Sequence, residues 1–133
     1  MDISRLEKWH FELSEGPANY LLSLVLQGKK RATASSLWAY QIDGDPLPAE
    51  GGMSVITDWS GTPACVVRTT AVHVLPYREI TFELARLEGE DDCLASWRKN
   101  HEQFFTEEGR QLGYVFSEEM PVIFEEFEIV ERL

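Results

Sequence analysis

Residues 28–35 combine basic and hydroxyl side chains at a spacing that could bind an anion or activate a hydroxyl group. The segment reads Gly-Lys-Lys-Arg-Ala-Thr-Ala-Ser, so Lys30 and Thr33 stand three residues apart. A fixed cation beside a hydroxyl can stabilise negative charge that develops during a reaction. The whole chain has a formal net charge of −11, which makes this segment an island of positive charge. Because an acidic surface repels long polyanions, the island favours a small ligand.

The same residues also have structural explanations, and the spacing alone leaves both open. Cations just past the C-terminus of a helix interact favourably with the helix dipole, which accounts for residues 29–31 without any ligand. A single threonine in a loop often hydrogen-bonds to the backbone.

Other reactive side chains form no recognisable catalytic or metal-binding set. The acidic segment 88–92 lacks the oxygen spacing of a calcium loop, and acids at this position can instead cap the helix that follows. The three histidines, His10, His73 and His101, are scattered, and His101 follows Trp97 by four residues, which favours a packing role. We therefore expect no metal and no cofactor.

Composition and charge limit the possible settings and partners. A chain of 133 residues with 44% hydrophobic residues is typical of one globular domain. No apolar stretch approaches the roughly 20 residues of a membrane helix, and the N-terminus does not resemble a signal peptide. We expect a cytoplasmic protein with no membrane partner. A pI of about 4.6 argues against binding nucleic acid by charge alone, so no DNA partner is expected.

The elements that would position Lys30 and Thr33 alternate between helices and strands, which predicts an α+β domain. An apolar run at 20–26 predicts a buried helix, starting near Pro17 and followed by Gly28 in a left-handed conformation. A short helix is expected before Pro17. The further predictions are a helical turn at 36–40, a hairpin of strands 53–58 and 64–74, helices at 79–87 and 93–108, and a strand at 121–129.

The segment Gly-Lys-Lys-Arg-Ala-Thr resembles the G-x-K-x-x-T loop of the ASCH domain, a relative of the PUA fold. Further stretches are similar to the longer bacterial branch of this family: S-L-W-A-Y at 36–40, G-D-P-L-P at 44–48, C-V-V-R-T-T at 65–70, E-G-E at 88–90, W-R-K-N-H at 97–101 and F-S-E-E-M-P-V at 116–122. The resemblance implies that residues 1–133 form a single ASCH domain, with a small, mostly antiparallel PUA-like β-barrel and flanking helices.

The resemblance also implies chemistry on RNA or its nucleosides. One shorter branch of the family hydrolyses N(4)-acetylcytidine with a lysine, a threonine and a glutamate, which match Lys30, Thr33 and Glu88 here. A longer member is described as cleaving RNA with a lysine and a serine, for which Lys30 and Ser117 are the candidates. We therefore expect an N(4)-acylated cytidine nucleoside as substrate, or alternatively single-stranded RNA, with or without ribonuclease activity.

Additional residues are candidates for substrate binding around this catalytic set. Lys29 and Arg31 belong to the basic segment, and Trp38 could stack on a base, although tryptophans more often serve a core. Arg68 on a predicted strand could orient a carbonyl or phosphate, and a plain surface role is equally consistent with its position. Ser117 completes this set.

A chemical argument assigns roles to the three catalytic candidates. A nearby carboxylate would keep Lys30 charged, so Lys30 is expected to stabilise the oxyanion rather than act as a base. Glu88 would accept the proton, while Thr33 attacks the carbonyl or positions an attacking water.

Overall fold

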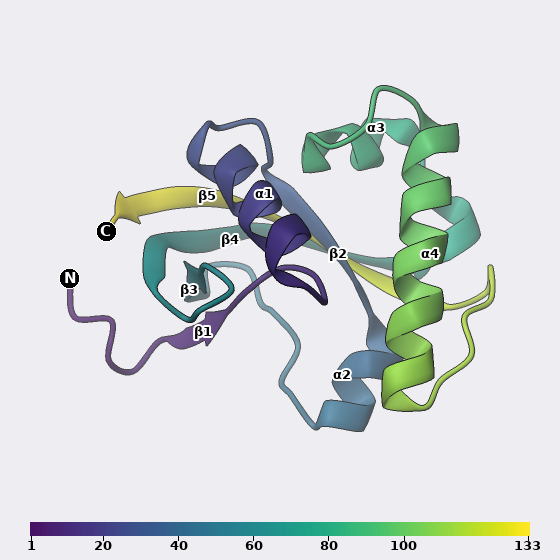
Figure 1. Cartoon of the computed structure of the whole chain (residues 1–133), viewed down its shortest axis with the longest axis horizontal. Coiled ribbons are helices and arrows are strands. Elements are labelled where there is room, and N and C mark those ends of the chain that lie inside the picture. Colours follow the sequence, from purple (N-terminus) through teal and green to yellow (C-terminus); the bar gives the residue numbers. More distant parts are fainter.

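The computed structural model describes residues 1–133 and contains one five-stranded sheet with helices packed on it (Figure 1). The strands are β1 (Glu7–Trp9), β2 (Ala32–Ser36), β3 (Met53–Thr57), β4 (Pro63–Pro76) and β5 (Pro121–Arg132), in the order β1-β3-β4-β5-β2. The helices are α1 (Glu15–Leu26), α2 (Leu37–Asp43), α3 (Phe82–Ala85) and α4 (Leu94–Leu112), with 3-10 turns η1 (Tyr77–Glu79) and η2 (Arg86–Glu88). The predicted α+β class is confirmed.

The sheet is mostly antiparallel and strongly curved. Strands β3, β4, β5 and β2 pair antiparallel in that order, and only β1 and β3 run parallel. The register between β4 and β5 shifts at Val66/Val67 and again at Thr69/Ala71. Such irregularities increase the local twist of a strand pair, so they help the sheet to curl into a half-barrel.

Two hydrophobic clusters hold the helices to the sheet. Helix α1 contributes Leu21, Leu22, Leu24 and Val25 to a cluster with Ile56, Cys65, Val67 and Phe127. Helix α4 contributes Trp97 and Phe105 to a second cluster with Tyr77, Val122 and Phe124. In Figure 1, α1 lies over the middle of the sheet and α4 lies at the end away from the chain termini. The two helices are therefore anchored to different parts of the sheet by separate clusters.

Helix boundaries follow the sequence closely in this part of the chain. Helix α1 includes Pro17 in its first turn, and Gly28 after it has a φ of 79°, so the predicted helix and its left-handed glycine are confirmed. Helix α2 begins after Ser36, whose hydroxyl accepts a hydrogen bond from the Ala39 amide, and Gly44 follows it with a φ of 71°.

Three sequence-based expectations are corrected by the structure. The short helix expected before Pro17 is wrong, because residues 7–9 form strand β1 and pair with β3. The helix expected over 79–87 is broken at Ile80, which has extended backbone between η1 and α3. The basic segment 28–35, treated as a loop, becomes strand β2 from Ala32 onward.

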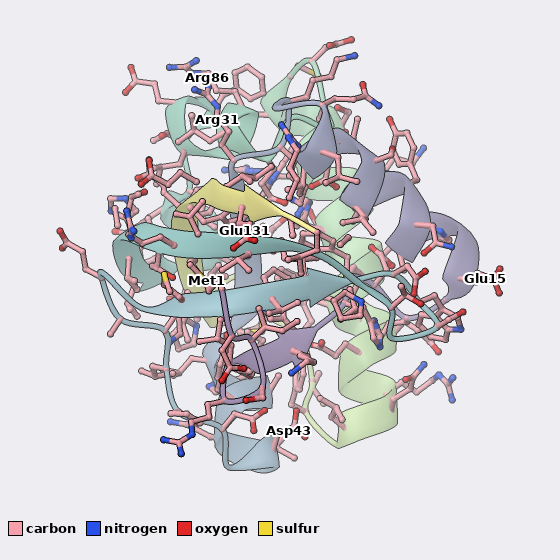
Figure 2. All side chains as sticks on the ribbon, turned by 90° about the vertical axis from the view of Figure 1, so that its left-hand side faces the viewer. Met1, Glu15, Arg31, Asp43, Arg86 and Glu131 are labelled. Atoms are coloured by element: carbon pink, nitrogen blue, oxygen red, sulfur yellow. The ribbon has the colours of Figure 1, made fainter.

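The two chain ends meet on one side of the molecule. The Met1 amino group lies 3.7 Å from a carboxylate oxygen of Glu131, and Figure 2 shows both residues on the side facing the viewer. None of the helices combines the length and the apolar character needed to cross a membrane.

Candidate functional site

Lys30 is turned into the interior by the end of helix α1. The amides of Lys29 and Lys30 both donate to the Leu24 carbonyl, at 2.9 and 3.1 Å, which closes the helix and directs the chain toward β2. Only 2% of Lys30 is exposed, in contrast to its exposed neighbours Lys29 and Arg31. A buried ammonium group requires partners of opposite charge.

Two glutamates supply those partners. The Lys30 Nζ lies 3.0 Å from Oε2 of Glu88 and 2.6 Å from Oε2 of Glu90. Glu88 is the last residue of η2 and Glu90 lies two residues after it. This turn is joined to the basic segment by a hydrogen bond from the Arg31 amide to the Leu87 carbonyl at 2.8 Å. The predicted encounter of Lys30 with Glu88 across 58 residues is therefore present.

Gly89 makes this encounter possible. It has a φ of 71°, and a Cβ atom at this position would lie 2.1 Å from the Lys29 carbonyl oxygen. Any other residue would combine left-handed strain with a backbone clash. The two glutamates can therefore flank the ammonium group only because glycine separates them.

Two aromatic residues of helix α4, Trp97 and His101, contact the buried Glu88 carboxylate. The Trp97 indole N–H donates to Oε1 of Glu88 at 3.1 Å, and the His101 ring stacks on Trp97 with 4.0 Å between centroids. The His101 Nε2 lies 3.1 Å from Oε1 of Glu88, and its Nδ1 lies 2.8 Å from the Trp97 carbonyl oxygen. Both ring nitrogens therefore face acceptors. Burial opposes a charge on His101, but the Glu88 carboxylate outweighs this effect and raises the pKa of His101, which favours the imidazolium form.

The pKa values of Glu88 and Glu90 are shifted in opposite directions by their surroundings. Burial disfavours the charged form of Glu88, but Lys30 and His101 outweigh this effect and hold the pKa of Glu88 well below its usual range. Burial raises the pKa of Glu90 to about 7, the adjacent Glu88 carboxylate adds to the rise, and Lys30 only partly offsets it. Burial also opposes the charge on Lys30, yet both carboxylates together raise its pKa. At neutral pH the cluster therefore has a fixed anion, a fixed ammonium group and a glutamate that exchanges its proton.

The cluster borders a small cavity that adjoins a larger one. A small cavity of about 70 Å³ is bordered by Lys30, Glu88, Glu90 and His101, and a larger cavity of about 480 Å³ lies next to it. The residues common to both walls are Phe11, Glu12, Thr33, Ala34 and Phe104. Thr33 is thus the hydroxyl residue at which the two cavities meet.

Glu12 contributes a strained backbone to the same boundary. It is the only non-glycine residue with a positive φ, at 63°. Non-glycine residues in this conformation are uncommon and cluster at functional positions.

The lining of the larger cavity includes several aromatic residues and several carboxylic acids. Trp9, Phe11, Tyr40 and Phe104 supply its aromatic residues. Its charged lining residues are all carboxylic acids: Glu7, Glu12, Asp43, Asp45, Glu108 and Glu125. No lysine, arginine or histidine lines it. A neutral ligand with flat, apolar surface fits this lining better than a phosphorylated one.

A metal ion is poorly suited to the cluster. Glu88, Glu90 and His101 each offer one ligand atom, and these atoms lie within 4.8 Å of one another. The Lys30 ammonium group, however, already contacts both carboxylates, and the imidazolium form that Glu88 favours in His101 has no lone pair for a metal. The protein itself supplies the cation that these acids require.

The predicted catalytic candidates converge in the structure, whereas the predicted binding residues do not. Lys30, Thr33 and Glu88 all border the small cavity. Lys29, Arg31 and Ser117 are exposed and absent from the walls of both cavities, and Arg31 lies near Arg86 in the view of Figure 2.

Trp38 and Arg68 also lie outside both cavities. The Trp38 ring packs against Tyr114 with 5.9 Å between centroids, as part of the α4 cluster. The Arg68 guanidinium is half-exposed and lies 3.3 Å from Glu128 on the neighbouring strand. Both contacts correspond to the structural alternatives considered for these residues.

Four residues of the site were not assigned a functional role from the sequence. Glu90 was visible as part of an acidic segment and of the E-G-E stretch at 88–90, and its position two residues after Glu88, across a glycine, was the available signal. His101 and Trp97 were assigned to packing, which describes their stacking but not their contacts with Glu88. Glu125 lies within the predicted strand 121–129, and nothing in that pattern indicated a cavity.

Comparisons with known proteins agree with this architecture. A family model described as the ASCH domain matches residues 7–131. The crystal structure of an ASCH domain from Lactobacillus crispatus is 35% identical and superposes with a TM-score of 0.85, over 94% of this chain and 79% of that one. Protein EF3133 from Enterococcus faecalis is 32% identical with a TM-score of 0.90, over 99% of this chain and 80% of that one. No curated protein sequence matches. The chain therefore belongs to the ASCH domain family and has its PUA-like fold.

Proposed function

We propose that this protein hydrolyses an acylated amine on a neutral, nucleoside-sized ligand, with an N(4)-acylated cytidine as the expected substrate. One observation carries the proposal: Thr33 lies where the cavity of the Lys30 cluster meets a larger cavity of about 480 Å³. This larger space suits a nucleoside, since small-ligand sites are typically about 300–1,000 Å³. The scissile group would lie at Thr33, with the rest of the ligand in the larger cavity.

Glu90 is better suited than Glu88 to accept the proton. A general base works best when its pKa lies near the working pH, and the pKa of Glu90 is raised to about 7. Glu88 is a weak base because Lys30 and His101 hold its pKa low, and its oxygens are already occupied by three donors. Glu88 is thus a positioning residue that fixes Lys30, whereas Glu90 performs the proton transfer, which contributes typically about 10²–10⁴-fold to the rate.

Lys30 supplies the positive charge for the oxyanion. An ammonium group has three N–H donors, of which two contact Glu88 and Glu90. The third donor remains for a substrate oxygen in the small cavity. A single donor of this kind typically contributes about 10²–10³-fold to the rate.

Thr33 provides the attacking oxygen in this scheme. Its hydroxyl is weakly nucleophilic until a base removes the proton, and Glu90 borders the same small cavity. The attack would form an acyl ester on Thr33 and release the amine. Water would then hydrolyse the ester.

The charge of the larger cavity favours a nucleoside over RNA. Six carboxylic acids and no basic residue line the cavity, so phosphate groups would be repelled from it. The exposed Lys29 and Arg31 lie outside the cavity and provide few contacts for a polyanion. Binding of single-stranded RNA, with or without cleavage, therefore has less support.

The test is to incubate the purified protein with N(4)-acetylcytidine and measure cytidine and acetate by mass spectrometry. We expect both products in equal amounts, at a rate that changes little with moderate salt. Thr33→Ala should abolish the reaction, and Thr33→Ser should retain part of it. No hydrolysis of any acylated nucleoside, together with RNA binding that weakens steeply as salt rises, would support the RNA alternative instead.

A further inference from the structure

Glu125 lies beside Thr33 on the side away from the Lys30 cluster. Strand β5 pairs with β2 so that Glu125 is directly opposite Thr33, and both residues line the larger cavity. Residues opposite each other in an antiparallel pair project from the same face of the sheet, with Cβ atoms about 4.5–5.5 Å apart. Glu90 therefore shares the small cavity with Thr33, whereas Glu125 shares the larger one.

The Glu125 carboxyl group is buried, oriented and only partly satisfied by the protein. The residue is 7% exposed, and the Thr69 hydroxyl donates to its Oε2 at 2.6 Å, which leaves Oε1 for a ligand. No basic side chain lines this cavity to neutralise a carboxylate. Burial raises the pKa of Glu125, and the nearby Glu7 carboxylate adds to the rise while Thr69 opposes it. Tyr40 lines the same cavity, and burial together with the Glu125 and Glu7 carboxylates raises its pKa to about 12, so it stays neutral.

We propose that Glu125 is the general acid of the reaction, which contacts the amide nitrogen of the substrate and protonates it as the carbon–nitrogen bond breaks. This inference rests on the proposed function. An amine cannot leave as an anion at neutral pH, so amide cleavage needs a proton donor on the nitrogen side. Among the groups that line the larger cavity, Glu125 is the carboxyl group paired directly with Thr33.

The two carboxyl groups balance the protons over a full cycle. The Thr33 oxygen bonds to the acyl carbon and gives its proton to Glu90, while the carbon–nitrogen bond breaks and the nitrogen takes a proton from Glu125. Water then attacks the ester and returns a proton to Glu125, and the Thr33 oxygen recovers its proton from Glu90. The net reaction consumes amide and water and yields carboxylic acid and amine, with no other reactant.

The environments of the two glutamates match these opposite roles. Burial raises the pKa of both carboxyl groups, but Glu90 contacts the Lys30 ammonium group, which stabilises its carboxylate when it gives up the proton, and its pKa of about 7 lets it accept one at neutral pH. Glu125 has a hydroxyl donor but no cation beside it, so its protonated form is favoured more than that of an exposed glutamate. Such pairs of carboxyl groups in different surroundings commonly divide acid and base work.

The test compares Glu125→Gln with the unmodified protein on two acetyl compounds. N(4)-acetylcytidine has a leaving amine that needs a proton, whereas 4-nitrophenyl acetate has a leaving group that departs as an anion. We expect kcat/KM for the amide to fall by about 10²–10⁴-fold and kcat/KM for the ester to change less than about tenfold. Formate should restore amide hydrolysis to Glu125→Ala, which provides a second readout that does not depend on the ester.

Each outcome bears on a different claim. An equal loss on both compounds, or amide hydrolysis at the original rate in Glu125→Gln, would overturn the role of Glu125. Failure of the unmodified protein to hydrolyse the amide would instead overturn the proposed function. Glu126→Gln is the matched control, because Glu126 lies on the same strand, contacts the half-exposed His73 and lines neither cavity. It should leave both reactions unchanged.

Discussion

Glu88 and Glu90 contact the same ammonium group, at 3.0 and 2.6 Å, yet their pKa values move in opposite directions. The reason is the second cation: His101 contacts Glu88 and not Glu90, so the shared negative charge is held on Glu88. Glu90 then experiences both burial and a neighbouring carboxylate. This asymmetry gives one glutamate a structural role and leaves the other free to exchange protons.

Substitution of the two glutamates should therefore have different consequences. Glu90→Gln should lower kcat/KM for N(4)-acetylcytidine by about 10²–10⁴-fold with little loss of stability. Glu88→Gln should lower the free energy of unfolding by about 3–5 kcal/mol, because Lys30 and His101 would lose a buried counterion. Steady-state kinetics and urea unfolding measure the two effects. Glu83→Gln, an exposed change on α3, is the control, and equal effects of the first two changes would contradict the division of roles.

The pH dependence of stability should report Glu90 separately. Its pKa is raised to about 7 in the folded protein, so the folded state binds the proton more tightly than the unfolded state. Its contribution to stability is therefore greatest below pH 4.5, the ordinary pKa, and is lost as pH rises toward about 7. Urea unfolding of the original protein and of Glu90→Gln between these pH values should show the variant gaining relative stability as pH rises. A constant difference would mean that Glu90 titrates normally.

Gly89→Ala should disrupt the Lys30 cluster in addition to straining the backbone. Gly89 and Gly61 both have positive φ, 71° and 90°, but only at Gly89 would a Cβ meet another atom within 4 Å. Gly61→Ala should cost about 1–2 kcal/mol of unfolding free energy, whereas Gly89→Ala should cost more and also abolish hydrolysis. Thermal unfolding and product assays of both variants provide the comparison. Similar losses in the two proteins would show that the close approach to Lys29 is not required.

A phosphate group on the substrate should lower kcat/KM. The acid-lined cavity should repel N(4)-acetylcytidine 5′-monophosphate, and we expect its kcat/KM to be at least about tenfold lower than that of the nucleoside, equivalent to about 1.4 kcal/mol. The difference in kcat/KM between the nucleoside and the monophosphate should become smaller at high salt, because screening weakens the repulsion between exposed charges. Asp45→Asn should also make this difference smaller, since Asp45 lines the cavity. A preference for the monophosphate would argue against the nucleoside assignment.

The elements near the basic segment could be predicted because their signals are local. An apolar run followed by glycine defines α1 and the turn at Gly28, and runs rich in apolar and β-branched residues define β4 and β5. Strand β1 is only three residues long and its pairing with β3 is parallel, so neither a hydrophobic periodicity nor a hairpin turn in the sequence indicates it. Its formation depends on a partner more than forty residues away.

The site could be predicted only in part, since it depends on burial and distance. The family resemblance predicts that Lys30 and Glu88 lie in one site, and the structure has them in contact. Sequence could not distinguish Glu88 from Glu90, because that distinction arises from His101 and Trp97 on a separate helix. Arg68 and Trp38 have the right chemistry for a ligand, but their positions on the sheet and on α2 direct them to Glu128 and Tyr114.

The separation of Lys30 from its partners by 58 and 60 residues has a consequence for assembly. Lys30 lies in the first half of the chain and its two glutamates lie in the second, so neither half alone contains the ion pairs of the cluster. Strand β2 is also hydrogen-bonded to the C-terminal strand β5. Regain of catalysis after dilution from denaturant should consequently coincide with the last cooperative step of refolding, and complementary proteolytic fragments should be inert until they reassociate.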